Sequence, residues 1–168
     1  MSAVRCDSAL SERGGLRSAG SRPLQPWVTL PSMSSPSHGS LRQVPIFSGL
    51  GEESLSHVAT LFAEFEAPAG QVLAEVGQAG TGCFIIEEGS VRVDLRGTDT
   101  VELGPGDFFG ELSVLTDTPR VGRVVTTSPI RAAAIRRNDL MDLLHREPSI
   151  AVAMLQEVAR RLVEAESG

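Results

Sequence analysis

Short apolar runs separated by turn-forming residues constrain the fold of this chain more than any other feature. The runs are Val72-Leu73, Cys83-Phe84-Ile85-Ile86, Val91-x-Val93-x-Leu95, Val101-x-Leu103, Val124-Val125 and Ala132 to Ile135. Gly, Pro, Asp or Ser interrupts them about every 8–12 residues, a spacing typical of an all-β sandwich or barrel. The sequence therefore predicts a β-roll of about eight strands, of the double-stranded β-helix or jelly-roll type, between Gly70 and about Ile135.

Apolar residues at helical spacing flank the predicted roll on both sides. One N-terminal helix, between Gly51 and Pro68, is predicted from residues three or four apart: Leu55, Val58, Leu61, Phe62 and Phe65. After the roll, Asn138 is the expected N-cap of a short helix, and Pro148 suits the first turn of a second one. The second helix has an apolar residue at every fourth position: Ile150, Met154, Val158 and Leu162. The predicted class is mainly β, with one N-terminal and two C-terminal helices.

The first forty residues differ in composition from the rest. They are rich in Ser, Gly, Pro and Arg, and such a stretch cannot bury enough apolar surface to offset its ordering entropy. We expect a disordered tail over residues 1–40 and a single domain over residues 41–168. Whether Met1 or Met33 is the natural start stays open, and a transit peptide is the alternative for the tail.

Composition argues against several classes of protein. Acidic residues outnumber basic ones by 21 to 15, which disfavours electrostatic binding to nucleic acid. No apolar run is long enough to cross a bilayer. Cys6 and Cys83 are the only cysteines, too few for a disulfide framework or a four-cysteine zinc site. We expect a cytoplasmic protein with no metal site and no membrane contact.

The most informative stretch is GDFFGELSVLTDTPRV, residues 106–121. Gly106 and Gly110 allow backbone conformations that other residues resist. The residues after Gly110 can form a short helix whose free N–H groups suit an anion. Arg120 would bring a permanently charged planar donor to the same place, whereas Glu111 suits a ligand that also carries hydroxyl groups. Together these groups favour a sugar phosphate.

This stretch resembles the cyclic nucleotide-binding domain, the β-roll shared by catabolite-activator-type regulators, cyclic-nucleotide-dependent kinases and gated channels. The most specific match is Phe109-Gly110-Glu111-Leu112, with Pro119-Arg120 beginning eight residues after the Glu. Further matches are Pro45-Ile46-Phe47-x-Gly49-Leu50, Ala69-Gly70-x-x-Leu73, Gly77, Ile85-Ile86-x-x-Gly89-x-Val91-x-Val93 and Leu103-x-x-Gly106-Asp107. The resemblance runs from about Leu41 to Glu166 and implies a domain of this fold that binds a cyclic nucleotide.

The resemblance also implies a role for each site residue. Glu111 would accept a hydrogen bond from the ribose 2′-hydroxyl, and Arg120 would pair with the exocyclic oxygens of the cyclic phosphate. The backbone N–H groups of Ser113 and Val121 would complete the phosphate site. Their neighbours at its edge would be Gly110 and Leu112.

For the base, the resemblance implies apolar walls and a lid. Val93 and Leu103 would form the walls. The last helix would close over the base, with Ala165 and Glu166 nearest to it.

Three residues after Pro119-Arg120 depart from the family pattern: Val121, Gly122 and Arg123. Val121 supplies an N–H group but no hydroxyl, and Arg123 stands where a Thr favours guanine in some relatives. Strand neighbours alternate faces, so we expect Arg123 to face solvent and cAMP to be the ligand. If Arg123 turns inward instead, its donors fit guanine O6 and N7, and cGMP becomes the ligand.

Other interpretations stay open. Glu111 and Arg120 could form a structural ion pair in a roll that has lost nucleotide binding. A metal-dependent cupin enzyme would need clustered histidines, but His38, His57 and His145 all lie outside the predicted strands. We therefore expect no catalytic residues.

The expected function is a regulatory module that signals by moving its C-terminal helices to an unknown protein effector, an enzyme or a transcription partner. No helix-turn-helix follows the last helix before Gly168, so we expect a stand-alone domain without direct DNA binding. The apolar stripe of the last helix could be core, lid or the seam of a homodimer. Arg136-Arg137 and Arg160-Arg161 are interpreted as solvated helix faces.

Overall fold

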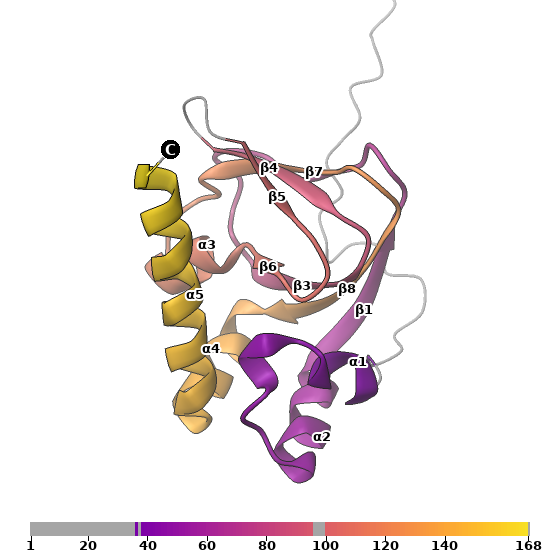
Figure 1. Ribbon diagram of the computed structural model, residues 1–168, viewed down its shortest axis with the longest axis vertical. Coiled ribbons are helices and arrows are strands. Elements are labelled where there is room, and N and C mark those ends of the chain that lie inside the picture. The colour runs from indigo at the N-terminus through magenta and orange to yellow at the C-terminus, as the bar shows by residue number, and fades with distance from the viewer. Residues whose placement is uncertain (1–35, 37, 96–99, 168) are drawn as a thin grey trace, which may run out of the picture.

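The computed structural model describes residues 36, 38–95 and 100–167, and within them eight strands form two four-stranded antiparallel sheets (Figure 1). The first sheet has the strand order β1-β8-β3-β6 and the second β2-β7-β4-β5. The strands are β1 Phe62–Ala67, β2 Val72–Ala74, β3 Gly82–Glu88, β4 Val91–Leu95, β5 Thr100–Leu103, β6 Phe108–Phe109, β7 Gly122–Thr126 and β8 Ile130–Arg136. This arrangement confirms the predicted β-roll with flanking helices.

Helices cover one face of the first sheet (Figure 1). They are α1 His38–Arg42, the 3-10 turn η1 Pro45–Phe47, α2 Glu52–Leu61, α4 Arg137–Arg146 and α5 Pro148–Ser167, while the short α3 Glu111–Thr116 follows β6. None of the helices in the described ranges combines the length and the apolarity needed to span a membrane. The predicted tail lies outside the described residues as far as residue 35, but α1 crosses the expected boundary at residue 40.

The first sheet has a core on each face, which explains why β3 and the middle of β8 appear in the sequence as continuous apolar runs, whereas β1 keeps Glu64 and the exposed Glu66. Ile85 and Ile135 belong to the core between this sheet and the helices. Phe84 and Ala134 point the other way, into the core between the two sheets. Because successive strand residues face opposite sides, both sets must be apolar. These two strands therefore lack the alternation of polar and apolar residues that marks a half-buried strand.

The prediction that one helix continues through Phe65 is wrong. Helix α2 ends at Leu61, and Phe62 and Phe65 lie in β1, paired with Ile135 and Ala132 of β8. The two rings belong to different cores. Three residues apart, two side chains share a helix face but lie on opposite faces of a strand. Pairing with β8 therefore overrides the apparent helical period.

The C-terminal helices follow the prediction with one correction. Helix α5 begins at Pro148, as expected. Helix α4 begins at Arg137 with Arg136 as its N-cap, so Asn138 lies inside the first turn and does not cap the helix. Ile150 and Met154 anchor the first half of α5 in the core. The second half rises beside α3 (Figure 1).

Candidate functional site

Gly110 makes the turn from β6 into α3 and creates the space for the Arg120 side chain. Its φ angle is +87°, in the left-handed region that side chains resist. The Arg120 guanidinium donates through Nη1 to the carbonyl of Gly110 at 2.9 Å and through Nη2 to the carbonyl of Gly82 at 2.8 Å. Helix α3 and the loop before β7 are thereby held together by one cation.

Arg120 is a buried cation without a carboxylate partner among the described residues. Its exposed fraction is 7%, and the ion pairs found within 4 Å in this part of the chain do not include it. Burial lowers the pKa of its guanidinium, while the more distant thiol of Cys83 and carboxylate of Glu111 raise it. The expected alternative of a direct Glu111–Arg120 ion pair is therefore wrong for this conformation.

Glu111 is the first residue of α3 and is also buried, at 6% exposed. Burial raises the pKa of its carboxyl, and its own backbone N–H group and the charge of Arg161 lower it in part. Its ion-pair partner is Arg161, with Nη1 at 3.7 Å from Oε1. The buried carboxyl group of Glu111 and the buried guanidinium of Arg120 thus lie on the same short segment without forming an ion pair.

The other predicted phosphate-site residues lie in α3 or directly after Arg120, and they differ in burial. Ser113 is buried in α3, whereas the Leu112 and Val121 side chains are 36% and 40% exposed. Within the described residues, no group of three or more His, Cys, Asp or Glu side chains could hold a metal ion.

The predicted base-contact residues do not all gather at the cassette, by which we mean residues 106–121. Leu103 of β5 belongs to the core between the sheets, and Val93 of β4 packs against that core. Arg123 is exposed and pairs with Glu75 at 3.5 Å. Ala165 and Glu166 are exposed on the last turn of α5.

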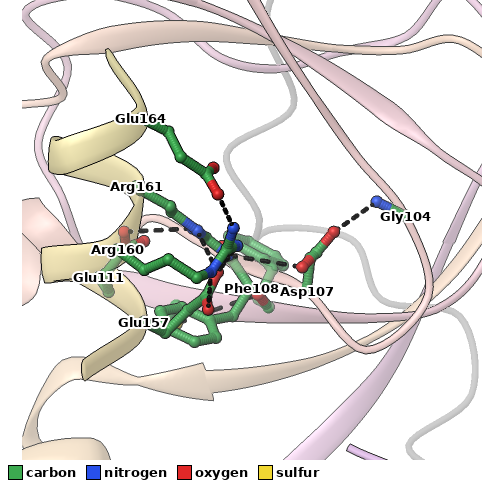
Figure 2. A network of polar contacts seen from close by, with 10 residues as sticks. Gly104, Asp107, Phe108, Glu111, Glu157, Arg160, Arg161 and Glu164 are labelled. Atoms are coloured by element: carbon green, nitrogen blue, oxygen red, sulfur yellow. Dashed lines mark hydrogen bonds and ion pairs between the residues drawn. The ribbon is translucent and has the colours of Figure 1, made fainter. Parts of the chain in front are cut away.

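Arg161 is the residue that sequence reasoning missed. The prediction of a solvated face is correct for Arg160, whose side chain is 53% exposed, but wrong for Arg161, whose side chain is 20% exposed. Arg161 donates to the carbonyl of Phe108 at 2.8 Å, and its guanidinium carbon lies 4.6 Å from the centre of the Phe108 ring (Figure 2). A helical phase count would have found it, because residue 161 follows Met154 by seven positions and Val158 by three.

A surface groove of about 680 Å³ lies elsewhere, between the end of the cassette and the start of α4. It is lined by Asp117, Thr118, Arg136, Arg137 and their neighbours. Its charged side chains already pair with one another, Arg137 with Asp117 and Arg136 with Asp139. Its lining includes Asp117, Thr118 and Pro119 from the end of the cassette, but neither Glu111 nor Arg120, the two buried charged residues described above.

The chain is similar in sequence to several known proteins. The cyclic nucleotide-binding domain family matches residues 64–147. The chain is 29% identical over 127 residues to the CRP-like cAMP-activated global transcriptional regulator of Mycobacterium tuberculosis, which covers 73% of this chain and 57% of the regulator. It is 33% identical over 108 residues to a cyclic nucleotide-gated potassium channel of Mesorhizobium japonicum, which covers 64% of this chain and 30% of the channel.

Among solved structures, the catabolite activator protein of Thermus thermophilus is similar, with a TM-score of 0.64 and 30% sequence identity. That likeness covers 73% of this chain and 60% of the activator. The chain therefore spans less than two thirds of each of these three relatives.

Proposed function

Because the chain belongs to the cyclic nucleotide-binding domain family, we propose that it binds a cyclic nucleotide, preferably cAMP, at the cassette and acts as a non-catalytic regulatory module. Its relatives include a regulator named as cAMP-activated and a channel named as cyclic nucleotide-gated. A transcription factor and a channel share only the nucleotide-binding step, so that step is the one we assign to this chain.

The observation that carries the proposal is Arg120, a buried guanidinium whose described partners are two backbone carbonyls. A buried cation is costly unless an anion accompanies it. The remaining donors of Arg120 and the N–H groups at the start of α3 suit a phosphate. Glu111 would accept the ribose 2′-hydroxyl, because a buried carboxylate accepts from a sugar hydroxyl and repels a bare anion.

Signalling would use the C-terminal helices. The second half of α5 lies beside α3 (Figure 1), so a change in the cassette can alter how α5 packs. Such a change transmits information only if a partner distinguishes the two positions of the helix. The effector is a protein that we do not identify, and an enzyme and a transcription partner are both compatible with the proposal.

A homodimer is a second element of the proposal, supported by the exposed side of α5. Val152, Leu155 and Leu162 are 54%, 67% and 60% exposed. Together with the exposed Ala159 they are spaced three, four and three residues apart, which is the repeat of a two-stranded coiled-coil seam. A second copy of α5 would cover this stripe.

Calorimetric titration of the purified chain with cAMP, cGMP and 5′-AMP tests the nucleotide proposal. We expect binding of the cyclic nucleotides and loss of binding in Arg120→Ala, by about 30-fold to several-thousand-fold for a lost contact of about 2–5 kcal/mol. The melting curve of the variant should stay cooperative. A variant that binds cAMP within a few-fold of the unaltered chain would show that Arg120 does not hold the phosphate.

A further inference from the structure

A second surface groove, of about 430 Å³, lies at one end of the first sheet. The end of β1, the end of β3 and the start of β8 contribute to it, and none of its lining residues belongs to the cassette. In Figure 1, β1 and α3 lie on opposite sides of the roll, so the groove is separate from the proposed nucleotide site. Its lining combines apolar side chains with charged ones: Glu66, Ala67, Pro68, Glu88, Pro129, Ile130 and Arg131.

Carboxylates outnumber guanidinium groups at this groove. Arg131 pairs with Glu88 at 2.5 Å and with Glu87 at 3.3 Å, both from β3. Glu66 of β1 lies opposite Arg131 in the strand pairing, is exposed, and has no ion-pair partner among the described residues. Three carboxylates thus share one guanidinium, and a second cation would reduce the excess of negative charge.

The chain enters the described part of the domain beside this groove. Ser40 in α1 donates to Oε1 of Glu87 at 2.5 Å, and the Glu87 side chain is 2% exposed. Glu87 in turn contacts Arg131, which lines the groove. The buried contact between Ser40 and Glu87 therefore holds α1 next to the groove, and the residues that precede α1 connect to the domain there.

The sequence before α1 carries the charge that the groove lacks. Residues 13–37 contain three arginines and no acidic residue. Arg22 is the arginine nearest to α1, sixteen residues before His38. Sixteen residues span up to about 50 Å when extended, which is more than the width of a domain of this size, about 36 Å. Arg22 can therefore reach the groove.

We propose that this groove is a docking site for the N-terminal segment of the same chain, and that Arg22 occupies it between Glu66 and Glu88. An arginine suits the lining because its planar group pairs with carboxylates. Its apolar stem covers neighbouring nonpolar surface, which Pro68 and Pro129 supply here. A segment that is disordered by itself becomes ordered where it binds.

The occupant is assigned to the same chain, and not to a separate partner, because the contact is weak. An exposed ion pair contributes little by itself. Attachment through α1 raises the local concentration of Arg22 to the millimolar range that short flexible linkers give, and a free peptide lacks this advantage. The contact does not involve the cassette, so it does not depend on whether a nucleotide binds.

Paramagnetic relaxation in the full chain tests the docking. A nitroxide on Ser21→Cys, in a chain that also carries Cys6→Ser, lies beside Arg22 in sequence, and the remaining Cys83 is buried. We expect the label to broaden the amide signals of residues 66, 67, 88, 130 and 131 more than those of residues 53 and 102. The broadening should disappear at about 1 M salt, where the Debye length is about 3 Å. Absence of this broadening at low salt would overturn the proposal.

Variants of the groove test its specificity. Glu66→Gln combined with Glu88→Gln should reduce the broadening by about twofold or more, the factor expected for loss of an exposed ion pair. Glu53→Gln combined with Glu102→Gln is the matched control, because it removes the same charge from two exposed positions outside the groove. An equal reduction in both double variants would mean that Arg22 responds only to the total charge of the domain, and would overturn the site.

Variants of the segment test its occupant. Arg22→Gln should reduce the broadening as the groove variant does, and it serves if the groove variant does not fold. Arg5→Gln removes the same charge outside residues 13–37 and should have no effect. Unchanged broadening in Arg22→Gln would overturn the assignment of Arg22. A labelled chain that broadens the signals of an unlabelled, isotope-enriched copy would overturn docking within one chain, because the segment would then reach a second copy.

Discussion

Gly110 and the guanidinium of Arg120 are in such close contact that no side chain fits between them. A Cβ atom on Gly110 would lie 2.5 Å from Nη1 of Arg120 and 2.9 Å from the carbonyl oxygen of Gly82. The two residues come from opposite ends of the cassette, and the position of one cation therefore depends on the absence of one methyl group ten residues earlier.

Gly110→Ala should consequently impair both stability and ligand binding. The left-handed backbone at this position costs a residue with a side chain about 1–2 kcal/mol, and the methyl group would also displace Arg120. We expect a melting temperature lower by several degrees and an affinity for cAMP lower by about tenfold or more. Thermal melts and calorimetry measure the two effects.

Gly49→Ala is the control for this change, because a Cβ atom at Gly49 meets nothing within 4 Å. It should leave affinity unchanged. If Gly110→Ala bound cAMP as tightly as Gly49→Ala does, the placement of Arg120 by the Gly110 turn would not matter for binding.

Glu111→Gln should stabilise the ligand-free protein at neutral pH. Burial raises the pKa of Glu111, so the folded state binds protons more readily than the unfolded chain. Its unfolding free energy therefore falls as pH rises from the ordinary Glu value of about 4.3 through the raised value. Gln carries no charge and avoids this loss.

Melting temperatures of both proteins between pH 4 and pH 8 test this prediction. The melting temperature of Glu111→Gln should be higher than that of the unaltered chain at pH 7, and the difference should become smaller toward pH 4. The affinity of the variant for cAMP at pH 7 should be lower. A gap that widens on acidification would mean that the Glu111 carboxylate is stabilised in the fold, contrary to the effect of its burial.

Leu155→Glu should dissociate the proposed homodimer. Leu155 is 67% exposed on the predicted seam of α5, and a buried, unpaired charge there is strongly unfavourable. Sedimentation equilibrium should give a dimer for the unaltered chain and a monomer for the variant. Gln156→Glu adds the same charge at the next position, which is also exposed but lies off the seam, and should remain dimeric. A monomer before any substitution would refute the dimer.

The sequence predicts most of the fold because each of its apolar runs corresponds to a strand, either buried on both faces as in β3 and β8 or buried on one face as in β4 and β7. It fails at Phe62 and Phe65, where the same spacing fits either a helix or a strand and only pairing with β8 decides. At the site, Gly110, Glu111 and Arg120 can be recognised in the sequence because a glycine, a carboxylate and an arginine occur together in one short segment. Arg161 can be recognised only by its helical phase relative to Met154 and Val158, and its residue type alone does not show that this face of α5 meets the cassette.

Arg123→Ala should leave the preference between cAMP and cGMP almost unchanged. Arg123 lies in β7 between the buried Gly122 and Val124, so its side chain is on the other face of the strand, where it pairs with Glu75 at 3.5 Å. An exposed pair of this kind contributes little to stability. Because Val124 lies opposite Val93 in the pairing of β7 with β4, Arg123 is on the face away from the core against which Val93 packs, and we expect it not to contact the base.

Competition binding of the two nucleotides to the unaltered chain and to Arg123→Ala provides the measurement, with Glu75→Gln as a control that frees Arg123 without removing it. We expect a weak preference for cAMP in all three proteins, since apolar walls discriminate poorly between purines. The contrary result would be a preference for cGMP of tenfold or more that Arg123→Ala abolishes. Arg123 would then have to leave Glu75 and turn inward to donate to guanine O6 and N7, a contact of about 1–3 kcal/mol.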